Sequence, residues 1–78
     1  MQDTVLNVIV TAYHSGLLQY HSLNVFGITV TMKMHGAFNT VTMQDDRSGK
    51  TSYIQVYDND SQDLQEYSIG MVLAEMFR

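Results

Sequence analysis

Apolar and polar residues alternate strictly in the middle of the chain, from residue 28 to residue 35. Positions 28, 30, 32 and 34 are apolar, and threonine, lysine or histidine lies between them. Successive side chains of a strand point to opposite sides of a sheet, so this pattern predicts a strand with one buried and one exposed face. Residues 38–44 and 51–57 alternate in the same way, and the three runs together predict an antiparallel sheet.

Two segments before this sheet are also predicted to be strands. Residues 4–13 are rich in valine, isoleucine and threonine, which favour strands, and we expect a largely buried strand there. Residues 17–25 fit either a strand or a short helix. The turn residues 14–16 just before them, ending in Gly16, favour a hairpin and therefore a strand.

The pattern changes after residue 57, where a helix is predicted to run to about residue 77. Asp60 or Ser61 is a suitable N-cap for it. At 100° per residue, one broad apolar sector is expected to pack on the sheet, and it consists of Ile69, Val72, Leu73, Met76 and Phe77. A second apolar sector lies roughly opposite and is left without a partner: Leu64, Tyr67, Met71 and Ala74.

These elements predict one α+β domain over residues 1–78, with about five antiparallel strands in meander order and one C-terminal helix packed on one face. A chain of this size buries only about 60% of its unfolded surface. It contains no cysteine, so a disulfide cannot add stability. A homodimer formed through the second apolar sector is therefore one expectation.

The charge balance argues against direct contact with nucleic acid. Eight acidic residues face four basic ones, for a formal net charge of −4, and the basic residues form no stripe that could neutralise phosphates. An acidic domain is suited instead to a protein partner with a basic surface, as nucleic-acid-handling complexes have. No stretch approaches the roughly 20 apolar residues that span a bilayer, and no signal peptide is evident.

Motifs for chemistry are weak. Gly49-Lys50-Thr51 resembles the end of a P-loop, but Gln44 stands where the first glycine is required. Residues 58–69 start like a calcium loop but lack its glycine and its final glutamate. The three histidines have no metal-ligand spacing. We therefore expect no enzymatic activity, no catalytic residues, no metal and no cofactor.

The outer face of the predicted sheet is the candidate working surface. It gathers tyrosine, histidine and threonine, which offer contact area with polar tips, although the same residues also favour ordinary strands. From the first predicted strand it is expected to include Asn7, Ile9, Thr11 and Tyr13. The carboxylates of the two loops could add one acidic edge. The residues predicted to contact a partner are His21, Thr40, Thr42, Asp45, Asp46, Tyr53, Gln55, Tyr57, Asp58 and Asp60.

In size, charge and architecture the chain resembles small proteins that phages and other mobile elements encode to block host defences, the anti-CRISPR type among them. The resemblance implies a non-enzymatic inhibitor that covers a basic surface of a host complex in the host cytoplasm. The alternative is a structural or assembly subunit that self-associates through its C-terminal helix.

Overall fold

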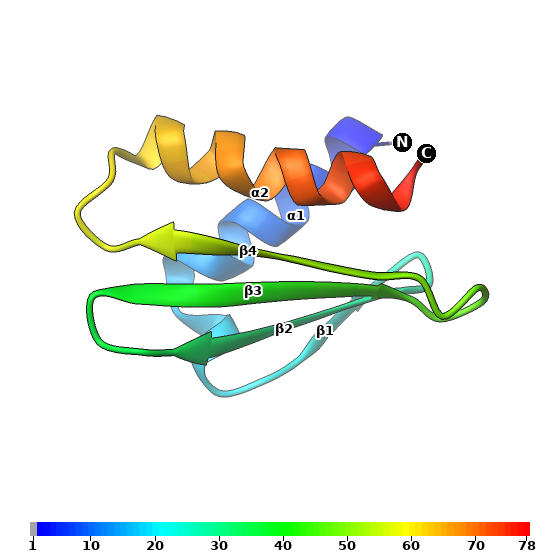
Figure 1. The fold of residues 1–78 in the computed structure, drawn as a ribbon, viewed down its shortest axis with the longest axis horizontal. Coiled ribbons are helices and arrows are strands. Elements are labelled where there is room, and N and C mark those ends of the chain that lie inside the picture. The colour runs from blue at the N-terminus through cyan, green and yellow to red at the C-terminus, as the bar shows by residue number, and fades with distance from the viewer. Residues whose placement is uncertain (1) are drawn as a thin grey trace.

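The computed structural model describes residues 2–78 as a four-stranded antiparallel sheet with two helices on one face (Figure 1). The predicted α+β class, antiparallel meander and C-terminal helix are confirmed. The prediction of five strands and a single helix is wrong, because the sheet has four strands and a second helix precedes it. In chain order the elements are α1 (Gln2–Ser15), the short 3-10 helix η1 (Leu17–Gln19), β1 (Leu23–Val25), β2 (Ile28–Met34), β3 (Phe38–Asp45), β4 (Thr51–Tyr57) and α2 (Gln62–Met76).

The segment predicted as the first strand is the helix α1. Val5, Ile9, Ala12 and Tyr13 recur at helical spacing and are all buried, whereas the exposed face contains Thr11 and other polar residues. Burial of this one face against the sheet and α2 outweighs the strand preference of the β-branched residues, which is worth only fractions of a kcal/mol per residue.

The second predicted strand is divided between two elements. Gly16 takes a positive φ of 84° before η1, and only the last three residues of segment 17–25 form a strand, β1. The turn at Gly16 therefore joins α1 to η1 and is not a hairpin. β1 is instead joined to β2 by the two-residue turn Phe26–Gly27.

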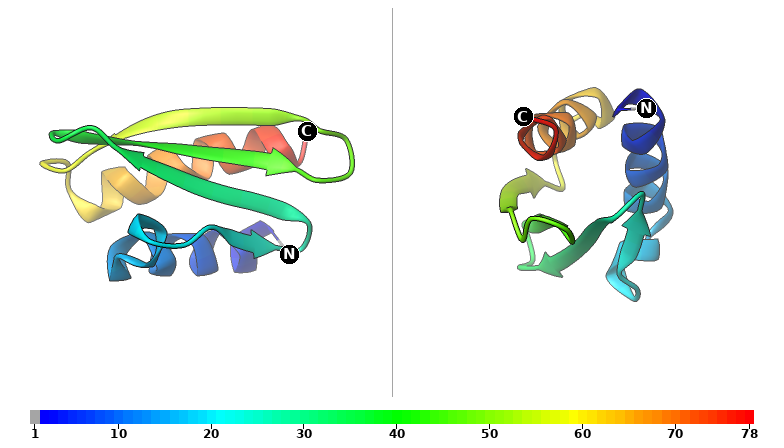
Figure 2. Two further views of the ribbon diagram at one scale, coloured as in Figure 1. Left: turned by 90° about the horizontal axis from the view of Figure 1, so that it is seen from below. Right: turned by 90° about the vertical axis from the view of Figure 1, so that its right-hand side faces the viewer.

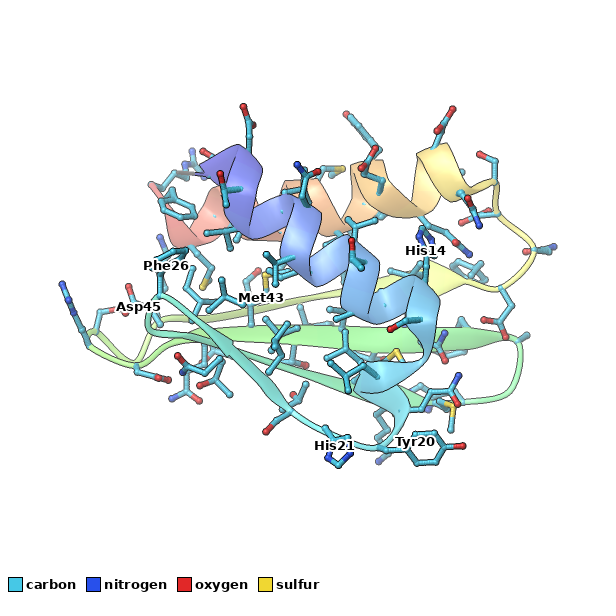
Figure 3. All side chains as sticks on the ribbon, turned by 180° about the vertical axis from the view of Figure 1, so that it is seen from behind. His14, Tyr20, His21, Phe26, Met43 and Asp45 are labelled. Carbon is cyan, nitrogen blue, oxygen red and sulfur yellow. The ribbon has the colours of Figure 1, made fainter. Side chains whose placement is uncertain are left out.

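One hydrophobic core lies between the sheet and the two helices. All strands, both helices and η1 contribute buried side chains to it. Those with no exposed surface are Val5, Ile9, Val30, Val41, Met43, Val56, Ile69 and Leu73. Met43 lies at the centre of this layer (Figure 3).

The two helices contact each other and run in roughly opposite directions (Figure 1, and Figure 2, left). Near the middle of α2, Gly70 leaves room for the Leu6 side chain of α1, since a Cβ at Gly70 would lie 3.6 Å from it. At the other end His14 of α1 reaches Gln65 of α2. The start of α1 consequently lies beside the end of α2. Neither helix is long and apolar enough to cross a membrane.

Candidate functional site

The outer face of the sheet, opposite the helices, is formed by the alternate residues of each strand. The register places Thr40 of β3 between Lys33 and Gln55, and it places Thr42 between Thr31 and Tyr53. Neither helix packs on this side (Figure 2), so most of these side chains stay exposed. We call this surface the outer face, and its members are Asn24, Thr29, Thr31, Lys33, Phe38, Thr40, Thr42, Gln44, Thr51, Tyr53, Gln55 and Tyr57.

Three rings meet at one end of the outer face. The His35 ring stacks on Phe38 with centroids 4.8 Å apart, and Phe38 contacts Tyr57 at 5.5 Å. His35 also shares a hydrogen bond of 3.1 Å with Thr40, which holds its ring over the sheet. We call His35, Phe38 and Tyr57 the aromatic cluster. Such preorganised rings offer large contact area at low entropic cost, which is typical of protein-binding surfaces.

The acidic residues of the two loops lie at opposite ends of the sheet. Gln44 pairs with Thr51 and Phe38 pairs with Tyr57. Asp45 and Asp46 therefore lie at the end of β3, whereas Asp58 and Asp60 follow β4 at the opposite end of the sheet. A seven-residue strand separates them by about 20 Å. They therefore do not form the single acidic edge considered from sequence.

Asp46 is engaged within the fold. Its carboxylate accepts hydrogen bonds from Asn24 Nδ2 at 2.7 Å and from Thr29 Oγ1 at 2.8 Å, and its backbone N–H donates to Gly27. It therefore joins the β3–β4 loop to the β1–β2 hairpin. Asp45 accepts from the Arg47 backbone and lies near Phe26 at the same end (Figure 3).

Asp58 belongs to a polar network that the sequence did not indicate. Asn39 is buried on the inner face and donates to Tyr13 Oη at 2.9 Å and to Asp58 Oδ1 at 3.1 Å. Burial raises the pKa of Tyr13, the Asn39 hydrogen bond lowers it, and the charges of Asp58 and Asp60 raise it, with a net increase. The one sign of this network in the sequence was a polar asparagine at an inward-facing position of the strand.

A second pair of hydrogen bonds fixes the start of α2. His14 Nε2 donates to Gln65 Oε1 at 3.0 Å, and Gln65 Nε2 donates to the Tyr57 backbone carbonyl at 2.8 Å. Ser61 caps the helix by accepting from the Leu64 N–H, which confirms one of the two predicted caps. These contacts fix the backbone at Tyr57, at the end of β4 from which its ring joins the aromatic cluster.

Not every residue predicted for the outer face lies on it. Thr40, Thr42, Tyr53, Gln55 and Tyr57 do. His21 is exposed but lies before β1, where it lines a shallow hollow with Tyr20 and Thr31 (Figure 3). The four residues assigned from segment 4–13 are on α1, where Ile9 and Tyr13 are buried and Asn7 and Thr11 face solvent far from the outer face.

The predicted second apolar sector of the C-terminal helix is exposed on α2. The exposed fractions of Leu64, Tyr67 and Met71 are 47%, 65% and 50%, and Ala74 is exposed beside them. Part of this sector borders a groove of about 500 Å³ between α1 and α2, lined by Leu6, Asp63, Glu66, Tyr67, Gly70, Met71 and Ala74.

Within residues 2–78 no group of three or more histidine and acidic side chains is arranged to hold a metal ion. No protein-family model matches the chain, and neither the curated proteins nor the solved structures include a significant match to it.

Proposed function

We propose that this chain is a non-enzymatic binding domain that occupies a surface of a larger protein partner through its outer face. The observation that carries the proposal is the aromatic cluster, three rings held in contact on a sheet face that no helix covers. Stacking and the hydrogen bonds of His35 and Tyr57 hold these partly exposed rings in place. Such rings lose little freedom on binding and release water from a large apolar area.

The negative charge close to the aromatic cluster favours a partner with a basic surface. From residue 51 to residue 77 the chain has five acidic residues and no lysine or arginine. Four of these, Asp58, Asp60, Asp63 and Glu66, belong to the β4–α2 loop and the start of α2, which follow directly on Tyr57. Negative potential beside an aromatic anchor favours basic grooves such as those of nucleic-acid-handling complexes. The narrower form of the proposal is an inhibitor that blocks such a groove.

Capture of a partner from a lysate of the source cells tests the proposal with two matched variants. Tyr57→Ala removes one ring of the aromatic cluster, and we expect affinity to fall by about 2 kcal/mol, roughly 30-fold. Met71→Glu alters the exposed sector of α2 and leaves the outer face intact, so capture should persist. Binding should also weaken as ionic strength rises.

Retention of the partner by Tyr57→Ala, with loss in Met71→Glu, would contradict this assignment. It would favour the second candidate function, a structural or assembly subunit that associates through α2. That candidate rests on the apolar sector Leu64, Tyr67, Met71 and Ala74, which remains exposed on the helix. Light scattering on the two purified variants separates self-association from binding to a different protein.

A further inference from the structure

The groove between α1 and α2 has an apolar floor and an apolar wall. Gly70 has no side chain and the Leu6 side chain packs beside it, so the floor lies low between the two helices. Tyr67, Met71 and Ala74 form the wall on the α2 side, and all three are exposed. Water pays a free-energy cost at such side chains, and contiguous apolar side chains around one hollow are typical of interaction sites.

The spacing of the wall residues fits a helical partner. Tyr67, Met71 and Ala74 follow one another at steps of four and three residues, the repeat of helices that pack along one another. The lining residues of α2 run from Asp63 to Ala74, which corresponds to about 16 Å or about three turns. A groove of this kind between two neighbouring helices is the usual seat of an amphipathic helix.

The charged residues of the groove are acidic. Asp63 and Glu66 line it, and Asp3 lies one turn before Leu6 on the same flank of α1. Neither helix contains lysine or arginine, and Arg78, which follows α2, is already held in an ion pair within the chain. Cations that complement these carboxylates therefore have to come from the partner.

We propose that the groove between α1 and α2 binds an amphipathic helix of a partner protein, apolar on one face and with lysine or arginine on its flanks. The apolar face covers Tyr67 and Met71. The flanking cations lay their apolar stems along the groove and place their charges beside Asp63 and Glu66. The helices lie on the opposite side of the sheet from the outer face (Figure 2), so the inference goes beyond the proposed function and does not depend on it.

A second copy of the chain is a poor occupant of this groove. Its own helices present the same carboxylates and no lysine or arginine, so pairing of two helix layers brings like charges together. The basic residues Lys33, Arg47 and Lys50 belong to β2 and the β3–β4 loop, not to a helix. Charge complementarity therefore favours a different protein as the partner.

A synthetic peptide of about 18 residues is a suitable probe, because it is long enough to form a helix in water. It has leucine at steps of three and four residues, lysine at the flanking positions and alanine elsewhere, and a matched peptide has glutamate in place of lysine. Fluorescence anisotropy should show saturable binding of the lysine peptide to the purified protein and at least about tenfold weaker binding of the glutamate peptide. Equal binding of the two peptides, or no binding, would overturn the proposal.

Variants of the protein locate the binding. Glu66→Lys and Glu75→Lys make the same charge change on α2, but the two positions lie about 180° apart around the helix. Glu66→Lys should weaken binding of the lysine peptide about tenfold and Glu75→Lys less than about twofold. Met71→Glu should also weaken it, whereas Tyr57→Ala on the outer face should not, which separates this groove from the proposed function. Equal effects of the two lysine variants would reject the groove as the site.

Sedimentation of the protein without peptide tests the competing occupant. We expect a monomer at all concentrations, because the helix layers of two copies repel each other. A concentration-dependent dimer that Met71→Glu dissociates would assign the groove to a second copy and would overturn the proposal.

Discussion

At the scale of single residues, Phe26 is the position where the sequence agrees least with its backbone. Phe26 and Gly27 form the two-residue turn of the β1–β2 hairpin with φ values of 51° and 82°. Turns with two positive φ values favour Asn-Gly, and an aromatic residue in this region is strained. The Phe26 side chain is 68% exposed, so burial does not compensate for the strain. Such conflicts between residue and backbone are commonest at functional positions.

Replacing Phe26 with asparagine should therefore stabilise the protein. We expect the free energy of unfolding to rise by about 1 kcal/mol and the melting temperature by roughly 4–8 °C. Thermal denaturation monitored by circular dichroism measures both. Gly27→Ala is the control: no atom lies within 4 Å of its added Cβ, yet φ is 82°, so a loss there reports backbone strain alone. A lower melting temperature for Phe26→Asn would show that the ring contributes to packing.

At the scale of elements, the sheet and the last helix could be predicted, and the first helix could not. Strict alternation bounded by turn residues leaves only one interpretation for β2, β3 and β4. Residues 4–13 match both periods, because 5, 9, 12 and 13 repeat at helical spacing in a segment where every second residue is also apolar. Tertiary burial decides between them. Asp3 in the first turn and His14 in the last turn were the available helix signals.

A substitution whose effect changes sign between helix and strand tests α1 directly. Thr11 is exposed on α1, so Thr11→Ala should raise the free energy of unfolding by about 0.5 kcal/mol through better helix propensity. In an exposed strand the same change would lower it. Ile9→Ala is the internal reference, with an expected loss of 2–5 kcal/mol from the buried face. Urea denaturation of the three proteins measures these differences.

Some features of the outer face could be predicted from the sequence, and others could not. The parity of a strand carries over to three dimensions, which is why Thr40, Thr42, Tyr53, Gln55 and Tyr57 share a face. The stacking of His35 on Phe38 depends on the conformation of a turn, and alternation says nothing about it. The separation of Asp45 from Asp58 does follow from the predicted hairpin, because Asp45 ends its first strand and Asp58 comes directly after its second strand.

At the scale of the whole molecule, stability and alkaline pH are linked through Tyr13, whose contacts join α1, β3 and the β4–α2 loop. Its pKa is raised in the folded protein, first by burial. Below about pH 10 the ring is protonated in both states and adds no pH dependence. Above this, the unfolded chain loses the proton before the folded one does, so stability falls as pH rises.

We therefore expect a loss of unfolding free energy above about pH 10 that Tyr13→Phe reduces, measured by urea denaturation at neutral and alkaline pH. Tyr53→Phe is the matched control, because the Tyr53 side chain is 69% exposed and the substitution makes the same chemical change outside the buried network. An identical alkaline loss in Tyr13→Phe and the unsubstituted protein would exclude this linkage.

The antiparallel contact between α1 and α2 also has a consequence for biosynthesis. When β4 has emerged from the ribosome, only α1 is available to cover the inner face of the sheet, because Ile69, Leu73 and Met76 emerge later. The core can close only after the last turn of α2 has left the exit tunnel. Until then the inner face of β3 and β4 is exposed to chaperones and to neighbouring nascent chains. Folding is therefore completed only when the final residues of α2 have emerged.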